Sequence, residues 1–377
     1  MENFSRLAFL NIEAWLKKHK AIVLIGARQV GKTTLVNKLI KNAKEKAVYL
    51  NADEANVRKT LDDATLNQLK DIIGTNKLIV IDEVQRIENA GLLLKRIVDN
   101  FKQVQLIATG SSALEIADKV FEPLTGRHVL MHLYPFSIYE LYKDESKLTI
   151  DNNLPFHLVH GFYPEICTHR NDAETLLKNL ASQYLYKDVL VWKDIRKPEL
   201  LNKLLQLLAY QIGSEVSLNE LATQLKIKTE TVESYIDLLE KAFVVFRLSS
   251  YATNHRKEVS KMKKIYFWDN GIRNAIINDF RHIQVRQDAG ALFENLMVAD
   301  RQKMNEWNNR NVKPFFWRTL QQQELDYLEK SASKITAFEF KYSELKKGKI
   351  TKAFTNAYPD ADAYLITPKE IKSFCLK

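Results

Sequence analysis

One octapeptide near the N-terminus constrains the fold more than any other feature of the chain. Residues 26–33 read Gly-Ala-Arg-Gln-Val-Gly-Lys-Thr and fit the pattern G-x-x-x-x-G-K-[ST]. An apolar run at 21–25 precedes them and a helical pattern at 33–42 follows. Glycines let successive N–H groups curl around a phosphate, and the next helix points its positive N-terminus at the same anion. This context predicts a phosphate-binding loop between a buried strand and a helix; the alternative is a plain glycine turn.

The residue types of the loop predict how a nucleotide is held. Lys32 can reach the β- and γ-phosphates, and Thr33 can place its hydroxyl on Mg²⁺. We therefore expect ATP and Mg²⁺ as cofactors, and we expect Lys32→Ala to abolish ATP binding or hydrolysis but to leave the fold of an exposed loop intact. The expected nucleotide-binding residues of the loop are Gly26, Ala27, Arg28, Gln29, Val30, Gly31, Lys32, Thr33 and Thr34.

A second apolar run, at 78–81, ends in two acids, Asp82 and Glu83. Open α/β sheets bind ligands at the carboxyl ends of their strands, where two carboxylates suit metal and water chemistry. We expect Asp82 to hold Mg²⁺, directly or through water, and Glu83 to orient or deprotonate the attacking water. For Glu83, a loop cap is the alternative.

Another apolar run, at 105–108, ends in Thr109, Gly110, Ser111 and Ser112. A hydroxyl of Thr109 or Ser111 beside a γ-phosphate could sense its presence. A polar strand-to-helix turn with a serine N-cap explains the same residues equally well.

The fold class follows from the alternation of apolar runs with helical patterns over the first 130 residues. The runs at 21–25, 47–50, 78–81 and 105–108 are uniformly apolar, which indicates a parallel sheet covered by helices on both faces. We therefore expect an α/β protein. Further apolar runs at 243–248, 265–268, 315–317, 325–328, 336–342 and 363–366 predict more strands.

Composition excludes several classes of protein. The 56 Lys and Arg against 46 Asp and Glu give a net charge of +10, which suits a phosphate-rich partner. The two cysteines, Cys167 and Cys375, make neither a disulfide framework nor a four-ligand zinc site. No apolar run approaches the ~18 residues that span a bilayer, and the first 20 residues do not read as a secretory signal. We expect a cytoplasmic protein without membrane association.

Residues 217–242 predict a helix-turn-helix, with residues 243–268 as a following hairpin. The expected recognition helix has four acids against Lys241, a net charge of −3, and should be repelled by a major groove. Residues 256–264 of the hairpin have five cations against Glu258, a net charge of +4; the cations are Arg256, Lys257, Lys261, Lys263 and Lys264. Two interpretations stay open for this module: a scaffold for domain packing, which we favour, and contact with DNA or RNA through non-specific phosphate contacts of the hairpin.

Near the C-terminus, acidic residues recur on strand and helix patterns. Glu339 and Lys341 share one face of the expected strand at 336–342, Asp326 lies in the preceding strand, and Glu294 lies on a helix that begins near residue 289. Carboxylates are hard ligands that suit Mg²⁺ or Mn²⁺. Charge pairs on a strand face are the alternative. A basic cluster beside them has a net charge of +4, with Lys341, Lys346, Lys347, Lys349 and Lys352 against Glu344.

The chain resembles the AAA-plus-type ATPases of bacteria and archaea, in the archaeal-ATPase-like group. The matching segments are 26–34, 82–85, 109–112, Leu-Thr-Gly-Arg at 124–127 and Leu-Tyr-Pro-Phe at 133–136. The resemblance covers nearly the whole chain. It implies a P-loop ATPase domain at 1–150, a helical and winged-helix-like region at 151–270 and a restriction-endonuclease-like domain at 271–377. Since such ATPases use an arginine against the γ-phosphate, it also assigns that role to Arg127.

The order Glu294, Asp326, Glu339 and Lys341 resembles the restriction-endonuclease-like nuclease core. The resemblance implies that the carboxylates bind Mg²⁺ and that the lysine activates water or steadies the phosphorus. We expect Mg²⁺-dependent ATP hydrolysis, with the nucleotide state controlling a C-terminal domain that contacts nucleic acid. An ATP-regulated nuclease and a nucleotide-dependent interaction module remain alternatives, and the oligomeric state stays open.

Overall fold

The computed structural model describes residues 4–16, 18–43, 45–111, 122–184, 197–251, 263–319, 321–343 and 350–376. They fall into two compact units. The N-terminal unit runs to Tyr134 and includes Lys241–Phe243, and the C-terminal unit contains Pro135–Glu240 and the chain from Val244 onward. The helices described in these ranges include none that is long and apolar enough to cross a membrane.

A parallel sheet forms the centre of the N-terminal unit. Its strand order is β2-β3-β4-β1-β5, and every neighbouring pair is parallel. The strands are β1 (Ala21–Ile25), β2 (Ala47–Asn51), β3 (Leu78–Asp82), β4 (Gln105–Gly110) and β5 (His128–His132). The predicted α/β fold with a parallel sheet is confirmed.

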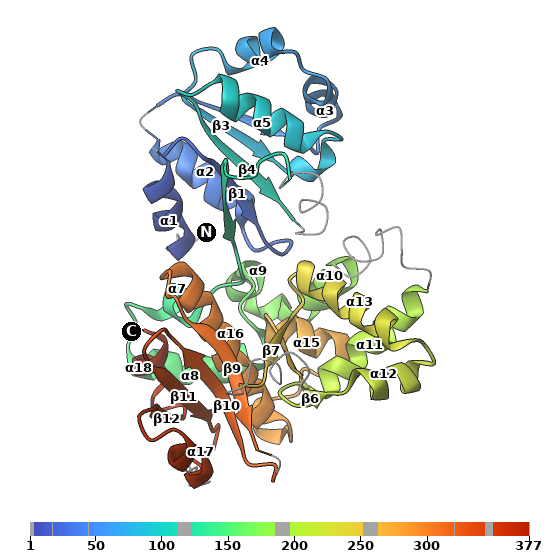
Figure 1. The fold of residues 1–377 in the computed structure, drawn as a ribbon, viewed down its shortest axis with the longest axis vertical. Helices are drawn as coiled ribbons and strands as arrows, with labels where there is room; N and C mark the ends of the chain where they lie inside the picture. The colour runs from blue at the N-terminus through green and yellow to red at the C-terminus, as the bar shows by residue number, and fades with distance from the viewer. Residues whose placement is uncertain are drawn as a thin grey trace. The chain divides into compact units, whose positions relative to one another are not determined.

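Helices flank this sheet (Figure 1). Strands β1, β3 and β4 are buried along their whole length, which is why their sequences are uniformly apolar. The edge strand β5 was not predicted, because polar and apolar residues are mixed along it and most of it is only half buried. The helices are α1 (Leu7–Trp15), α2 (Lys32–Asn42), α3 (Ala55–Asp62), α4 (Leu66–Ile73) and α5 (Ala90–Asn100), with a 3₁₀ turn η1 (Val84–Arg86) after β3.

The C-terminal unit begins with helices. In chain order they are α7 (Ile138–Tyr142), α8 (Lys147–His160), α9 (Pro164–Thr168), α10 (Ala173–Tyr184), α11 (Pro198–Tyr210), α12 (Leu218–Leu225) and α13 (Thr229–Lys241, whose last residue is grouped with the N-terminal unit). The Ser217 side chain accepts a hydrogen bond from the Glu220 N–H and caps α12. Helices therefore lie where the helix-turn-helix was expected.

Two small sheets complete the C-terminal unit. The first has the antiparallel order β6-β8-β7, with β6 (Glu215–Val216), β7 (Val245–Ser249) and β8 (Lys263–Phe267). The second has the order β12-β11-β10-β9, with β9 (Lys313–Arg318), β10 (Glu324–Lys330), β11 (Ile335–Phe340) and β12 (Asp362–Ile366). Only β11 and β12 pair in parallel in this sheet. The backbone N–H of Tyr251 donates to the carbonyl of Phe316 (2.7 Å) and ties the two sheets together.

Helices also cover the second sheet. They include α16 (Ala289–Trp307), α17 (Lys352–Ala357) and α18 (Ile371–Cys375), whereas α15 (Asn270–Ile277) packs against β8 of the first sheet. An irregular register between Leu325 and Leu328 puts both leucines into one apolar core with Phe354. Asp326, the residue after Leu325, lies on the opposite face of β10. This alternation places the predicted acidic site away from the apolar core.

Candidate functional site

The phosphate loop joins β1 to α2 and needs glycine at two positions. Gly31 has φ +94°, and a Cβ there would meet nothing within 4 Å. Gly26 fits for a different reason, because a Cβ on it would lie 2.0 Å from the carbonyl oxygen of Leu133. The loop is thus packed against the chain after β5 at one end and open at the other, next to the N-terminus of α2.

Lys32 is the first residue of α2 and is 6% exposed. Its Nζ donates to the carbonyl oxygens of Gly26 and Ala27, at 2.8 Å each. The expectation that this lysine belongs to an exposed loop is wrong, because the ammonium is folded into the loop it serves. Lys32→Ala therefore removes two hydrogen bonds of the loop as well as a phosphate-facing charge.

Thr33 and Asp82 meet at the carboxyl end of the sheet. The Thr33 hydroxyl donates to Oδ2 of Asp82 (2.8 Å), and the Thr109 hydroxyl donates to the other carboxylate oxygen, Oδ1. A hydroxyl and a carboxylate side by side are the oxygen ligands that Mg²⁺ prefers. With the lysine and the helix N-terminus beside them, the residues present fit a magnesium nucleotide.

Tyr49 of β2 is a third donor to Asp82. Its hydroxyl is 2.6 Å from Oδ2, the oxygen that also accepts from Thr33. Burial and then the Asp82 hydrogen bond raise the pKa of Tyr49, so the phenol remains a donor. Sequence reasoning missed this contact, which depends on the register that pairs Asn51, two residues later on β2, with Asp82.

Glu83 has the left-handed backbone conformation φ +54° directly after β3. Its N–H donates to the Thr109 hydroxyl (3.2 Å), and its Oε2 accepts from Nε2 of Gln85 (2.5 Å). The same Nε2 also donates to the Ser111 hydroxyl (3.0 Å). Gln85 was part of the motif at 82–85 but had no predicted role; here it links the proposed base to the end of β4.

The remaining loop positions differ in exposure. Val30 is buried, Arg28 is half-buried, and Gln29 and Thr34 are exposed. Gln29 also has a left-handed backbone, with φ +57°. Ser112, the last residue of the motif at 109–112, lies outside the described residues.

Arg127 is not brought to the phosphate loop. Its carbonyl accepts from the N–H of Ala21, the first residue of β1, whereas the loop follows the last residue, Ile25. About 13 Å of strand separates those two ends, at ~3.3 Å per residue. The Arg127 side chain pairs with Asp99 (Nε to Oδ1, 2.8 Å). The expected contact with a γ-phosphate is therefore not made within this unit. The register of β5 puts Arg127 at the amino ends of the parallel strands, whereas the phosphate loop lies at their carboxyl ends.

The second candidate site lies in the C-terminal unit, where the structure gathers the four predicted residues. Glu294 comes from α16, Asp326 from β10, Glu339 from β11, and Lys341 follows β11. Burial raises the pKa of Asp326, and the charges of Glu294 and Glu339 raise it further. The residues that sequence reasoning named are thus electrostatic neighbours.

Each of these carboxylates already has a protein partner. Oε1 of Glu294 accepts from the Tyr266 hydroxyl (2.7 Å), Oδ2 of Asp326 accepts from the Phe340 N–H (2.8 Å), and Oε1 of Glu339 pairs with Nζ of Lys341 (2.6 Å). Within the described ranges, no group of three or more His, Cys, Asp or Glu is arranged to hold a metal ion. The present arrangement therefore does not fit the expected Mg²⁺.

Lys264 of β8 completes this cluster and was assigned differently from sequence. It was counted among the hairpin cations expected to face phosphate, but it is 1% exposed and its Nζ lies 3.0 Å from Oε1 of Glu294. Burial by itself lowers the pKa of Lys264, but the Glu294, Asp326 and Glu324 carboxylates raise it above its usual value. Lys264 therefore belongs to a buried ion pair and cannot contact a phosphate at the surface in this structure.

The other basic residues expected to meet nucleic acid lie largely outside the described residues. They are Arg256, Lys257 and Lys261 of the hairpin and Lys346, Lys347 and Lys349 of the second cluster. On the expected recognition helix, Asp237 and Glu240 pair with Arg247 of β7. Two of the four acids of α13 thus hold the helix to the hairpin.

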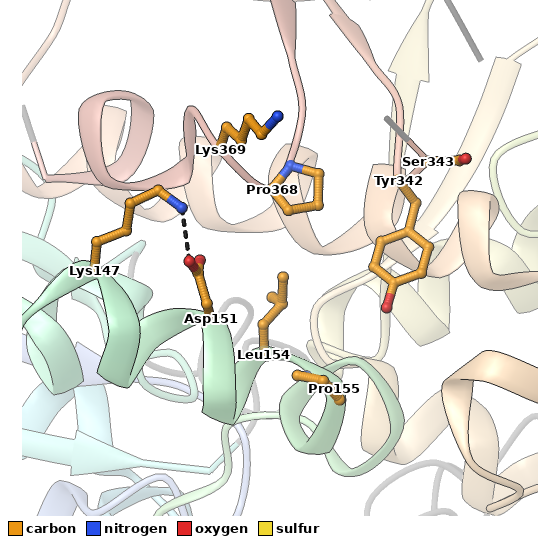
Figure 2. Close-up of a pocket in the computed structure, with 8 residues that line it drawn as sticks. All are labelled: Lys147, Asp151, Leu154, Pro155, Tyr342, Ser343, Pro368 and Lys369. Carbon is orange, nitrogen blue, oxygen red and sulfur yellow. Dashed lines mark hydrogen bonds and ion pairs between the residues drawn. The ribbon is translucent and has the colours of Figure 1, made fainter. Parts of the chain in front are cut away.

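A pocket of about 480 Å³ lies elsewhere in the C-terminal unit (Figure 2). Lys147 and Asp151 of α8 are bonded to each other at one end of it (2.7 Å), and the ring of Tyr342 stands at the other. It is lined by Lys147, Asp151, Leu154, Pro155, Tyr342, Ser343, Pro368 and Lys369. None of the residues predicted for either site lines this pocket.

Three family models match successive parts of the chain. Residues 18–142 match an AAA domain. Residues 151–283 match a domain of unknown function (DUF8612), and residues 289–373 match another (DUF4143). The AAA match covers the phosphate loop and Asp82, so it agrees with the resemblance seen in the motifs. The restriction-endonuclease-like assignment has no counterpart among these matches.

Two uncharacterized proteins match most of this chain in sequence. An uncharacterized protein of Mycobacterium tuberculosis is 26% identical over 332 residues, which are 86% of this chain and 71% of the relative. An uncharacterized protein of Methanocaldococcus jannaschii is 28% identical over 303 residues, which are 69% of this chain and 63% of the relative. The similarity thus extends well beyond the phosphate loop.

Solved structures show weaker likeness. A DNA replication initiation factor covers 64% of this chain and 89% of its own at 17% identity, with a TM-score of 0.28. Drosophila ORC bound to AT-rich DNA and Cdc6 covers 72% and 89% at 10% identity, also with a TM-score of 0.28. At such scores these structures carry no argument about this chain.

Proposed function

We propose that the chain is a Mg²⁺-dependent ATPase whose N-terminal unit binds and hydrolyses ATP. The observation that carries the proposal is the meeting of Thr33 with Asp82 beside Lys32 at the N-terminus of α2. The AAA match over residues 18–142 supports it. The alternative of a plain glycine turn does not account for the hydroxyl, the carboxylate and the lysine at one end of the sheet.

The residues divide the work of phosphoryl transfer, which needs mainly positioning and charge neutralisation. Lys32 would exchange its bonds to the Gly26 and Ala27 carbonyls for bonds to phosphate oxygens. Thr33 and Asp82 would hold the metal ion, which when bound neutralises charge on the β- and γ-phosphates.

Glu83 would orient the attacking water or accept its proton. Gln85 and Thr109 would keep Glu83 in place, since they bond its carboxylate and its N–H. Ser111 would hold Gln85, whose amide bonds both the Ser111 hydroxyl and Glu83, so the end of β4 would be linked to the proposed base and could respond to a γ-phosphate.

The nucleotide state would control the C-terminal part of the chain, which we propose contacts DNA or RNA through phosphate charges. The net charge of +10 supports this partner class. In this proposal residues 1–150 form the ATPase domain, 151–270 a helical and winged-helix-like region, and 271–377 a restriction-endonuclease-like domain. A nucleotide-dependent interaction module without cleavage would share this organisation.

The test measures phosphate release by the full chain with Mg²⁺ and ATP. Lys32→Ala should lose ATP binding or turnover, whereas Glu83→Gln should bind ATP and hydrolyse it at least a hundredfold more slowly, in line with loss of a general base. Lys41→Ala is the matched control, because Lys41 is an exposed lysine of the same helix. Wild-type turnover in Lys32→Ala would refute the assignment.

A second candidate function, ATP-regulated nuclease activity, is favoured by the gathering of Asp326, Glu339 and Lys341. Strand breakage is assayed in the same reactions, with and without DNA or RNA. Cleavage that is lost in Asp326→Asn and Lys341→Ala but kept in Lys32→Ala without ATP would support a nuclease. Phosphate release without strand breakage would leave only the ATPase.

A further inference from the structure

Lys264 carries a positive charge into the centre of the carboxylate cluster. Its Nζ lies 3.0 Å from Oε1 of Glu294 and also pairs with Glu324, and the lysine is 1% exposed. Buried charges are tolerated when they are paired in this way. The ammonium therefore compensates the negative charge of the carboxylates, which a bound metal ion would otherwise have to do.

The strand pairing of β8 fixes the ammonium in this place. Lys264 lies opposite Glu215 of β6 and Leu248 of β7, so strands on both sides hold its register. Tyr266, two residues along β8, shares its face and donates to the same oxygen of Glu294 (2.7 Å). Two side chains of one strand thus occupy the carboxylate that α16 contributes.

The charges around Lys264 show what its removal would leave. The cluster contains four carboxylates and three cations that pair with them. The cations are Lys264, Lys341, which pairs with Glu339, and Arg318, which bridges Glu215 and Glu324. The four carboxylates are Glu294, Glu324, Asp326 and Glu339. Arg318 is shared with a fifth carboxyl group, Glu215, so removal of Lys264 would leave five carboxyl groups and two cations. An excess of this size on hard oxygen ligands is the environment in which divalent cations bind.

We propose that Lys264 is the resident cation of this cluster and excludes divalent metal ions from it while β8 keeps its register. A cation of the Mg²⁺ or Mn²⁺ class then enters the cluster only when the ammonium is removed from it. An ammonium and a dication repel each other and compete for the same oxygen of Glu294, so the two states exclude each other. The proposal does not depend on ATP hydrolysis in the N-terminal unit.

The test titrates the full chain with Mn²⁺ without nucleotide and follows free Mn²⁺ by electron paramagnetic resonance. All proteins carry Asp82→Asn, which removes the carboxylate of the phosphate-loop site. Lys264→Met and Lys264→Gln should each bind one Mn²⁺ at least tenfold more tightly than the background protein. Lys334→Met is the matched control, because it removes the same charge from an exposed pair with Asp362, and its binding should equal the background.

Adding Glu294→Gln to either Lys264 variant should abolish the gain, which assigns the ion to the cluster. Lys264→Gln retains a donor for Glu294, so it guards against a fold lost in Lys264→Met. If Lys264→Met folds only with Mn²⁺, that rescue supports the proposal. Mn²⁺ binding in both Lys264 variants no tighter than in Lys334→Met overturns it. The proposal is also overturned if the background protein, with Lys264 in place, already binds an Mn²⁺ ion and Glu294→Gln abolishes that binding.

Discussion

His157 on α8 should make the C-terminal unit lose stability as the pH falls from 7 to 5. The imidazole is 1% exposed, with Nδ1 2.8 Å from the carbonyl oxygen of Gly161 and Nε2 2.6 Å from the Tyr142 hydroxyl. Since a carbonyl only accepts, the neutral ring carries its proton on Nδ1. Burial lowers the pKa of His157 to about 3 even though the Gly161 hydrogen bond acts in the other direction.

The sign and size of the effect follow from proton linkage. Between pH 3 and the ordinary histidine value of about 6.5, the unfolded chain binds a proton that the folded chain does not. Stability is therefore fully present above about pH 6.5 and is lost at about 1.4 kcal/mol per pH unit as the pH falls towards 3. From pH 7 to pH 5, His157 should cost the unit about 2 kcal/mol.

Urea unfolding at pH 7 and pH 5 measures this loss, with tryptophan fluorescence as the signal. Trp268, Trp307 and Trp317 belong to the same unit as His157. His157→Gln removes the titration and keeps a donor and an acceptor, so its loss of stability should be about 2 kcal/mol smaller than that of the wild type. His169→Gln, at an exposed position, is the control and should behave as the wild type.

The comparison between variants is needed because burial also raises the pKa of other carboxyl groups in this unit, among them Asp269, Asp300 and Asp326. Raised carboxyl pKa values make stability fall as the pH rises, the opposite sign to His157. Their contribution is common to all variants and cancels in the difference. An equal loss in the wild type and His157→Gln would refute the reasoning.

Three further results are expected. Gly26→Ala should lower stability by about 1–3 kcal/mol and weaken ATP binding, because its Cβ would lie 2.0 Å from the carbonyl oxygen of Leu133. Gly290→Ala is the control, since its Cβ would meet nothing within 4 Å, and equal melting temperatures of the two variants would contradict the prediction. Tyr49→Phe should lower the Mg²⁺ concentration for half-maximal phosphate release several-fold, because one donor no longer competes for Asp82; an unchanged Mg²⁺ dependence would refute this role. Nucleic-acid binding should weaken at least tenfold between 50 and 200 mM salt and depend little on sequence, as counterion release requires, and salt-independent binding measured by fluorescence anisotropy would contradict it.

The phosphate loop and Asp82 could be predicted from sequence because their signals are local. Strand, loop and helix follow one another within residues 21–42, and a buried strand leads directly to the acid at 82. Parallel pairing then brings strand ends together whatever the details of packing. The contact between Thr33 and Asp82 is therefore a consequence of patterns visible in the chain.

Contacts that depend on register were not predictable in the same way. The role of Tyr49 requires β2 to pair with β3 in one particular alignment, and the misplacement of Arg127 arises from the unpredicted edge strand β5. The contact of Gln85 with Glu83 depends on the left-handed backbone conformation of Glu83. The sequence does not predict that conformation, because no glycine stands at this position. Each miss concerns a side chain whose partner is set by an alignment between distant segments.

Lys263 and Lys264 show how much one residue of register decides. Both were counted as phosphate contacts, because a charge sum treats every lysine of a segment alike. Adjacent side chains of a strand point to opposite sides, however, and at this end of β8 Lys263 is half-buried whereas Lys264 is buried among carboxylates. A shift of one residue would exchange the two lysines and bring Ile265 in place of Tyr266 to Glu294, which would then lose a hydrogen bond. The acids of α16 and β10 thus favour this register of β8, and a basic stretch on such a strand offers a nucleic acid only the charges that the register leaves outside the buried cluster.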